Sequence, residues 1–552
     1  MREDEPREAA AVAAAAGSPS AGEHSESLRE TLISIIIAFA LAFVFRSFVL
    51  EPFVIPTGSM APTLLGAHVQ AQSPFTGWTW PVNPRDYARG ADLPLPVQGG
   101  QRGPITVTDP RTGPPARKRG LTIYPGEGSG VPLSFSALPL RAGDRIVVLK
   151  HIYALRPPRR WEIIVFKSPE TPTENFIKRL VGLPGESLRI VDGDIFTRPL
   201  DSPPDAPWRI ARKPYSLQRT LWRPLFSSEY TPIAQQGHKP DWTSPWTGTG
   251  WQRDGAEYTF QGPADAEAAL AWNETAWPIT DWVPYNELLL QRGQPLTRFP
   301  VGDVRVRFTV DPPGSTLEAT VVISTRSHVF EAVLSDRQTS LRSRPVNDPE
   351  GWTTLAQGPP VRWRPGTPLN VEVWHADQRL SLWADGTRLL SAAYDWSADE
   401  RQRFALGIAG EEPVQTEWIM NPASYTRTSV GLRFRGDVQG LSLHRVGLDR
   451  DLHYQAGWSR RRSGPLRAVT KETAVELGRD EFFVLGDNSP ASRDARMWDH
   501  VSPWVEAQFD EKPGVVPRAL ILGKAFFVYW PAPHRGAWGI PIPDFGRMRF
   551  VF

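Results

Sequence analysis

The sequence predicts a mainly β protein of several domains that follows one N-terminal apolar helix. Its 552 residues are enough for several domains at the usual ~100–200 residues each. The 55 prolines and 45 glycines favour short strands and ordered turns over long helices. From Val301 to Leu452, apolar and polar residues alternate in many segments of strand length. This pattern predicts an inserted antiparallel β-sandwich of jelly-roll type.

Charge and cysteine content exclude several classes of function. The 62 basic and 60 acidic residues give a net charge of +2, so the chain offers no strongly charged field for nucleic acid. The sequence contains no cysteine, which excludes disulfides, a cysteine nucleophile and a cysteine-bound zinc site. We therefore expect no metal, no cofactor and no nucleic-acid partner.

The N-terminal region predicts a tail followed by a membrane anchor. Residues 1–27 are rich in Ala, Glu and Ser and lack aromatics, which is typical of a disordered tail. Residues 28–50 contain the uncharged run Thr31–Phe45, and Arg46 can extend its side chain to the interface so that the span approaches ~20 residues. A buried core helix and a cleaved signal peptide are the alternatives, but no small-residue cleavage site follows the run. We expect an uncleaved single-pass anchor.

The distribution of basic residues predicts the orientation of this anchor. Arg2, Arg7 and Arg29 precede the apolar run, whereas no Lys or Arg lies between Arg46 and Arg85. Because basic residues accumulate on the cytoplasmic side, the N-terminus is expected in the cytoplasm and the chain after residue 50 outside.

Residues 67–140 contain two similar turns, Ser73–Gly77 ("SPFTG") and Asp109–Gly113 ("DPRTG"). Both resemble the C-P-x-C-G knuckle of a zinc ribbon with every cysteine replaced, so neither should hold zinc. An unrelated loop is the preferred interpretation of this segment, and a degenerate ribbon is the alternative.

Ser59, in the turn "IPTGSMAPTL", needs a base before its hydroxyl can act as a nucleophile. None of the ten histidines stands in a recognisable triad motif. A buried lysine is another base, because burial disfavours the charged ammonium. Lys178 in "FIKRLVGL" shares one strand face with Phe176 and Leu180. The pattern alone nevertheless favours a strand lysine that reaches solvent.

Five blocks of sequence resemble the bacterial type I signal peptidases: "IPTGSMAPTL", "GDRIVVLK", "FIKRLVGLPGES", "GDNSPASRDAR" and "LGKAFFVYWP". They occur in the family's order and cover Leu50–Gly66, Arg141–Thr197 and Val469–Pro531. The resemblance implies a membrane-anchored serine protease with a Ser–Lys dyad on a β-fold that faces the outer side of the membrane.

The resemblance also assigns roles to individual residues. It makes Ser59 the nucleophile and Lys178 the general base, with the Ser59 N–H and the Thr57 hydroxyl as donors to the oxyanion. It makes Ser492 the residue that hydrogen-bonds and orients the lysine. The remaining matched residues are Asp487, Asn488, Asp494 and Arg496, expected to support the site, and Met60, Phe53 and Ile55, expected on the face toward substrate or membrane.

The expected domain order places two insertions in one catalytic core. After the cytoplasmic tail (1–27) and the anchor (28–50), the core is expected in three parts, 51–66, 141–199 and 466–552. Between them lie an insertion (67–140), a connector (200–242) and a sandwich insert (243–455) that resembles laminin-G or concanavalin-like domains.

The expected function is removal of signal peptides from exported precursors at the outer (periplasmic) side of the bacterial inner membrane. Its partners would be those signal peptides, the lipid bilayer and the secretion translocon. The alternative is a membrane-anchored envelope- or glycan-binding protein with an inactive peptidase core. For the insert, a structural or docking role is preferred over glycan or envelope binding, and Trp242, Trp246 and Trp251 could stack on sugars or fill a core.

Overall fold

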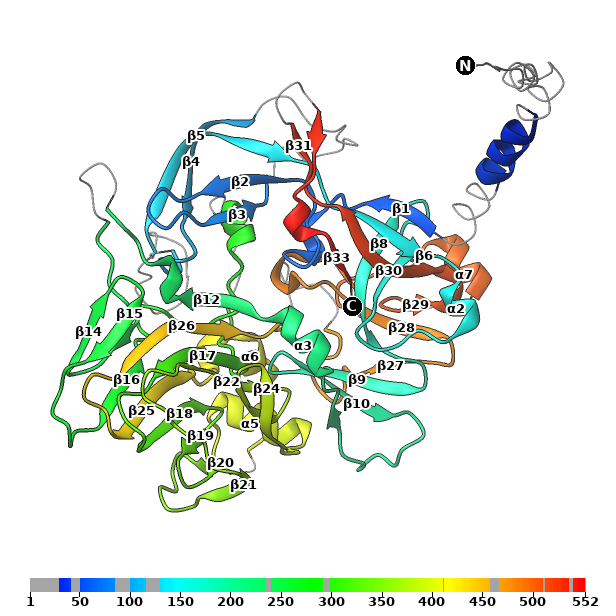
Figure 1. Cartoon of the computed structure of the whole chain (residues 1–552). Helices are drawn as coiled ribbons and strands as arrows, with labels where there is room; N and C mark the ends of the chain where they lie inside the picture. Colours follow the sequence, from blue (N-terminus) through cyan, green and yellow to red (C-terminus); the bar gives the residue numbers. More distant parts are fainter. Residues whose placement is uncertain are drawn as a thin grey trace, which may run out of the picture.

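The computed structural model describes residues 29–40, 50–84, 100–115, 130–234, 240–290, 298–410, 412–456, 466–509, 512–535 and 540–551. The fold is mainly β, as the sequence predicts, and consists of a core sheet, a smaller sheet from residues 67–141 and a β-sandwich (Figure 1). The expected tail, residues 1–27, lies outside the described residues.

The core sheet is assembled from segments far apart in the sequence. Apolar residues with strand periodicity, such as Ile146, Val148 and Ile163, bury one face of it. A second sheet, β11 (Arg209–Ile210), β10 (Asp194–Pro199), β9 (Glu186–Val191) and β27 (Val475–Glu476), packs nearby. The order in the core sheet is β1 (Leu50–Val54), β6 (Arg145–Leu149), β30 (Ile521–Trp530), β7 (Ile163–Lys167), β8 (Asn175–Gly182), β28 (Glu481–Leu485) and β29 (Val516–Pro517), with β33 (Arg549–Phe550) on β30.

Four strands from the described residues between 68 and 141 form a separate antiparallel sheet, which we call the knuckle sheet. Its two turns lie against each other, and Thr76 Oγ1 donates a 2.7 Å hydrogen bond to Asp109 Oδ2. Ser73, Thr76, Asp109 and Thr112 stand at the positions where a zinc ribbon would have cysteines, and the degenerate ribbon stays a prediction. The order is β3 (Thr79–Val82), β2 (His68–Gln72), β5 (Pro132–Arg141) and β4 (Gly100–Thr108).

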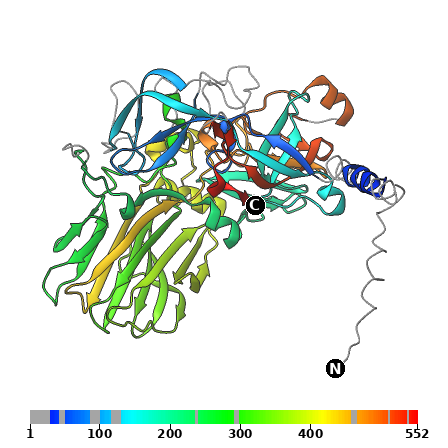
Figure 2. The same ribbon diagram turned by 45° about the horizontal axis from the view of Figure 1, so that its top comes forward.

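The sandwich confirms the predicted antiparallel β insert. Figure 2 shows the strands of this insert, and apolar side chains from its two sheets form one core. Trp246 is buried in that core, and Trp242 and Trp251 pack against it, so these tryptophans fill a core. The first sheet is β14 (Trp251–Asp254), β15 (Glu257–Phe260), β26 (Ser442–Arg450), β17 (Val304–Asp311), β22 (Leu369–Ala376), β23 (Arg379–Ala384) and β24 (Thr387–Ala393), with β12 (Arg223–Ser227) on β26. The second is β13 (Trp246–Thr247), β16 (Ala268–Trp272), β25 (Ser429–Gly436), β18 (Leu317–Thr325), β19 (His328–Ser335), β20 (Thr339–Pro345) and β21 (Thr353–Gly358).

Helices are few and short in the described part of the chain. Residues 29–40 are helical and exposed, and 41–49 lie outside the described residues. Among the described helices, none has both the length and the apolar character that crossing a membrane requires. The predicted transmembrane helix over 28–50 is therefore not confirmed. The other helices are α2 (Ile152–Leu155), α3 (Tyr215–Leu221), α4 (Glu287–Leu290), α5 (Ala398–Leu406), α6 (Thr416–Met420) and α7 (Pro503–Phe509).

Buried ion pairs join the sandwich to the core, in a group of residues that we call the junction cluster. Arg401 of α5 lies 2.6 Å from Asp194 of β10. Lys213 of the 200–242 segment contacts Asp377 and lies 3.0 Å from Asp451. The insert is therefore tied to the core by buried ion pairs as well as by the chain itself. The cluster comprises Asp192, Asp194, Lys213, Asp303, Arg326, Asp377, Arg401 and Asp451, all buried.

Candidate active site

Ser59 lies in a one-turn 3₁₀ helix, η1 (Gly58–Met60), a few residues after β1. Apolar side chains anchor this turn, because Ile55, Met60 and Leu64 pack in the core beneath the sheet. A Cβ on Gly58 would lie 2.3 Å from the Tyr285 ring, so only glycine lets the turn pack there. The backbone therefore holds Ser59 at a fixed position beside β8.

Lys178 points from β8 toward this serine. Its Nζ lies 2.9 Å from Ser59 Oγ and 3.0 Å from the carbonyl oxygen of Ile177, and it donates to both. The lysine is 4 % exposed, so the solvent-reaching orientation that the pattern alone favours is wrong. Burial lowers the pKa of Lys178 to about 8, although Asp494 and Asp487 act to raise it.

Asp487 is bound by Arg179, the residue that follows the lysine on β8. Arg179 Nε and Nη2 donate to its two carboxylate oxygens at 2.8 and 2.7 Å. Thr63 Oγ1 adds a 2.6 Å hydrogen bond. Burial alone would raise the pKa of Asp487, but Arg179 holds it below its usual range. This carboxylate is therefore ionised and engaged in a bidentate pair.

Asp494 makes the second such pair in the loop after β28. Arg496 Nε and Nη2 each donate to Asp494 at 2.8 Å, and Asp494 also accepts from the Gly486 N–H at 3.0 Å. Asn488 joins the loop to the Ser59 turn, since its N–H donates to the Ser59 carbonyl and its Nδ2 to the Gly58 carbonyl. The loop is thereby fixed against the turn that carries Ser59.

Thr57 and Ser492 lie at the site with weaker contacts. Thr57 is exposed, and its Oγ1 lies 3.5 Å from Ser59 Oγ. Ser492 Oγ is buried, and no group among the described residues forms a hydrogen bond with it. The bond to Lys178 that the resemblance implies is thus not formed here. A Cβ on Gly486 would lie 2.1 Å from Ser492 Oγ and 2.5 Å from the Ser59 carbonyl oxygen, so glycine allows the loop to approach both.

The expected face toward substrate or membrane needs correction at two of its three residues. Ile55 is 2 % exposed and Met60 is fully buried, because both side chains fill the core that anchors the turn. Phe53 is partly buried against the same core. Val54 lies on the opposite face of β1 from Phe53 and is 54 % exposed, so its side chain faces outward from the core.

The sandwich insert supplies residues to the site that the sequence did not predict. Asn286 and Asn488 exchange two amide hydrogen bonds, of 2.6 and 2.9 Å. Tyr285 packs on Gly58 and is buried. Arg223 Nη2 donates to Thr63 Oγ1 at 2.7 Å. These residues lie in segments without a periodic pattern or motif, so no local signal identifies them.

The comparisons with known proteins agree with the sequence motifs. Residues 28–86, 134–205 and 450–530 match the family model described as signal peptidase, peptidase S26. The matched segments contain Ser59, Lys178 and Ser492 and leave out most of the sandwich. The resemblance to the signal peptidases is therefore confirmed.

Individual relatives match only part of this chain. Signal peptidase I of Leptolyngbya laminosa is 38 % identical over 104 residues, which are 16 % of this chain and 51 % of that protein. A probable signal peptidase I-2 of a Synechocystis strain is 33 % identical over 82 residues, 14 % of this chain and 38 % of that protein. The chain thus spans about half or less of the length of these curated relatives.

One solved structure, carbohydrate-binding module CBM66 from Bacillus subtilis, covers 37 % of this chain and 96 % of its own. It has 7 % sequence identity and a TM-score of 0.22. A likeness at that score carries no argument about the sandwich or its ligand.

Proposed function

We propose that this chain is a membrane-bound serine endopeptidase that removes signal peptides from exported precursor proteins by a Ser–Lys dyad mechanism. The carrying observation is the 2.9 Å contact between Lys178 Nζ and Ser59 Oγ. Burial lowers the pKa of this lysine to about 8, so its neutral form is accessible near physiological pH. The match to the S26 model supports signal peptides as the substrate class.

In the proposed reaction, neutral Lys178 accepts the hydroxyl proton of Ser59 while Ser59 Oγ attacks the carbonyl carbon of the scissile peptide bond. In this step the hydrogen bond between the two residues has the opposite direction, because the Ser59 hydroxyl donates and the neutral Lys178 amine accepts. The Ser59 N–H and the Thr57 hydroxyl are the proposed donors to the resulting oxyanion. Lys178 returns its proton to the leaving amine, and water, activated by the same base, hydrolyses the acyl-enzyme and regenerates Ser59.

The core residues around the dyad have supporting roles in this proposal. Arg179 and Arg496 engage the carboxylates of Asp487 and Asp494, which keeps those anions from pairing directly with the lysine. Ser492 is the proposed orienting residue, and its bond to Lys178 would form when substrate binds, since apo hydrogen bonds at catalytic sites often tighten only in the complex.

Asn286 of the insert is a further positioning residue in the proposal. It holds the side chain of Asn488, whose Nδ2 donates to the Gly58 carbonyl and whose backbone N–H donates to the Ser59 carbonyl. The insert would thereby act on the nucleophile without touching substrate.

Residues 28–50 are the proposed membrane anchor, with the N-terminus in the cytoplasm and the catalytic region on the periplasmic side of the inner membrane. Residues 29–40 are helical and exposed, and the apolar run continues to Phe45. Because Ser59 follows Leu50 by nine residues, the site would lie close to the membrane surface, where a signal peptide emerges. Protease added outside intact spheroplasts should digest the region after residue 50, and protection of that region would reverse the topology.

The experiment that tests the activity is cleavage of a signal-peptide precursor by the purified full chain and by Ser59→Ala. The variant should lose cleavage while its unfolding curve is unchanged, since it loses one hydroxyl in a turn. Ser134→Ala, on the exposed side of β5, is the matched control and should keep full activity. Near-normal turnover by Ser59→Ala would refute the nucleophile assignment. A wild-type chain that folds but cuts no precursor would favour the inactive, envelope-binding alternative.

A further inference from the structure

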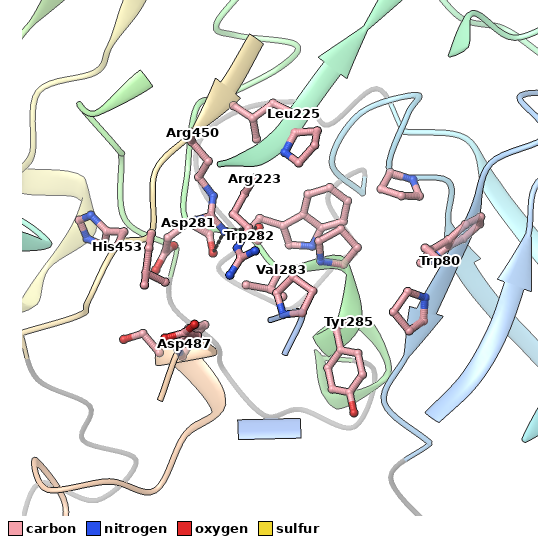
Figure 3. Close-up of a pocket in the computed structure, with 18 of the residues that line it drawn as sticks. Trp80, Arg223, Leu225, Asp281, Trp282, Val283, Tyr285, Arg450, His453 and Asp487 are labelled. Atoms are coloured by element: carbon pink, nitrogen blue, oxygen red, sulfur yellow. Dashed lines mark hydrogen bonds between the residues drawn. The ribbon is translucent and has the colours of Figure 1, made fainter. Parts of the chain in front are cut away.

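A cavity of about 240 Å³ lies where the core, the knuckle sheet and the sandwich meet (Figure 3). We call it the junction pocket. Neither Ser59 nor Lys178 lines it, so it is separate from the dyad. Its size is just below the range of roughly 300–1,000 Å³ typical of small-molecule sites, which indicates a small ligand. Its walls include Trp80, Arg111, Leu225, Trp282, Tyr285 and Ser489.

The walls are largely apolar and aromatic. Figure 3 shows Trp80 and Tyr285 on one side, with Val283 and Leu225 from the sandwich insert around the same space. Such a surface stabilises an apolar body, and aromatic rings favour a flat one. The polar groups in the walls then determine which charged or hydrogen-bonding groups a ligand needs.

Arg111, from the second knuckle turn, is a buried cation with unused donors. It is 6 % exposed, and no acceptor among the described residues bonds its Nε or Nη1. The Trp78 and Tyr230 rings lie 3.8 and 4.8 Å from its guanidinium carbon. Stacking on the rings leaves the in-plane N–H groups unsatisfied, which is costly for a buried charge. Burial lowers the pKa of Arg111 to about 10, so it remains charged at neutral pH.

Two indole groups add to this excess of donors. Trp80 Nε1 and Trp282 Nε1 are buried and have no acceptor within the described part of the chain. Indole can only donate, so an oxygen of a bound ligand would be an acceptor for either group. Three residues that line one cavity thus lack acceptors.

The anions already in the walls are engaged elsewhere. Asp487 pairs with Arg179. Asp281 accepts from the Phe299 N–H at 2.8 Å and from Gln455 Nε2 at 2.7 Å. Neither carboxylate is hydrogen-bonded to Arg111.

The other basic groups in the walls are also engaged or neutral. Arg450 donates to the backbone carbonyls of Asp281 and Trp282, and Arg223 donates to Thr63. Burial lowers the pKa of His453, which keeps that ring neutral. Arg450 Nε also lacks an acceptor among the described residues, whereas Arg111 lacks one at both Nε and Nη1, so of these two arginines Arg111 offers the pocket more unbonded donors.

We propose that the junction pocket binds a small organic anion with a flat apolar body and one carboxylate, held by Arg111. A planar carboxylate matches the in-plane donors of a guanidinium whose neighbours are aromatic rings. Because Tyr285 and Ser489 are also wall residues, the occupant touches both the insert and the loop that contacts the Ser59 turn.

The probe for this proposal is 2-naphthoate, titrated into the full chain by calorimetry, with neutral 2-naphthamide as its matched control. We expect a Kd below about 1 mM for the acid and at least tenfold weaker binding of the amide. Arg111→Gln should weaken naphthoate binding at least tenfold. Arg344→Gln, which alters another arginine beside a tryptophan, should leave it unchanged.

Leu225→Trp gives a second test that keeps Arg111 intact, because it fills the cavity. It should abolish binding while the melting temperature of the free protein stays within a few degrees. Equal binding of acid and amide, or naphthoate binding that survives both Arg111→Gln and Leu225→Trp, would overturn the proposal. So would no binding at millimolar probe. None of these outcomes depends on precursor cleavage, so they are independent of the proposed peptidase activity.

Discussion

Two buried lysines, one in the core sheet and one at the junction with the sandwich, show how neighbours decide what a buried charge does. Lys178 is 4 % exposed and Lys213 is 3 % exposed, so both lose the same hydration. Lys178 donates to a hydroxyl and a carbonyl. Lys213 contacts the carboxylates of Asp377 and Asp451.

The pKa values of the two lysines move in opposite directions for this reason. Burial lowers that of Lys178 to about 8. At Lys213 burial also acts to lower the pKa, but Asp377 and Asp451 raise it well above its usual value. A buried lysine in contact with carboxylates stays charged and can hold two domains together, whereas a buried lysine without such a contact can serve as a base.

Lys178→Met should have the largest effect on cleavage. The substitution keeps the length of the side chain and removes the amine. Cleavage should fall by about three orders of magnitude or more, because removing one member of a catalytic unit disables it. Stability should not fall. Burial lowers the folded-state pKa below that of the unfolded chain, so burying this lysine costs up to about 3 kcal/mol below pH 8. Precursor cleavage and urea unfolding at pH 7 measure the two effects. Retained cleavage would remove Lys178 from the mechanism.

Lys213→Met is the matched change at the other lysine, and it should lower stability while leaving kcat unchanged. Removing the ammonium leaves Asp377 and Asp451 buried without their cation, which should lower the free energy of unfolding by about 3–5 kcal/mol. The fraction that remains folded should keep the wild-type kcat, because Lys213 does not contact the dyad. Unfolding followed by tryptophan fluorescence, with kcat per folded molecule, checks this. Unchanged stability would show that the junction cluster does not hold the domains together.

The contrast between the two lysines also explains which features the sequence could predict. Lys178 lies on a strand with apolar neighbours at period two, and Ser59 lies in a short turn, but only the resemblance to the signal peptidases pairs the two residues. The sandwich follows from the alternation between Val301 and Leu452. Lys213 and Asp377 are 164 residues apart, and no local pattern pairs them.

The wrong predictions for the outer face also arise from contacts between residues far apart in the sequence. Ile55 and Met60 were expected on an outer face, yet the side on which β1 and the turn bury their residues depends on strands that arrive later in the chain. Asn286 contacts Asn488, which lies in a distant part of the chain. The walls of the junction pocket likewise come from several separate segments. Periodicity shows which residues are buried, but not which distant residue each one meets.

The pH dependence of cleavage gives a third prediction. With a pKa of about 8, the neutral fraction of Lys178 falls tenfold for each pH unit below that value. The logarithm of kcat/KM should therefore rise with unit slope from about pH 5 to 7 and level off above about pH 8 to 9. Initial rates on a precursor without titrating residues near its cleavage site measure this profile. A flat profile from pH 5 to 9, with chemistry rate-limiting, would contradict a neutral-lysine base.

The smallest expected effect tests whether the sandwich acts on the dyad as well as on stability. Asn286→Ala removes both amide bonds to Asn488, whose side chain and N–H hold the carbonyls of Gly58 and Ser59. We expect kcat to fall roughly tenfold, equivalent to ~1.4 kcal/mol in the transition state, with KM changed less than twofold because substrate does not contact Asn286. Asn273→Ala, which removes an exposed side-chain bond to the Ala276 N–H in the same insert, should leave both constants unchanged. The pH midpoint should also stay near 8 in Asn286→Ala, since Lys178 keeps its burial. A wild-type kcat in a folded Asn286→Ala chain would mean that the turn carrying Ser59 is held by the core alone, and that the insert contributes to the proposed activity only through the junction cluster.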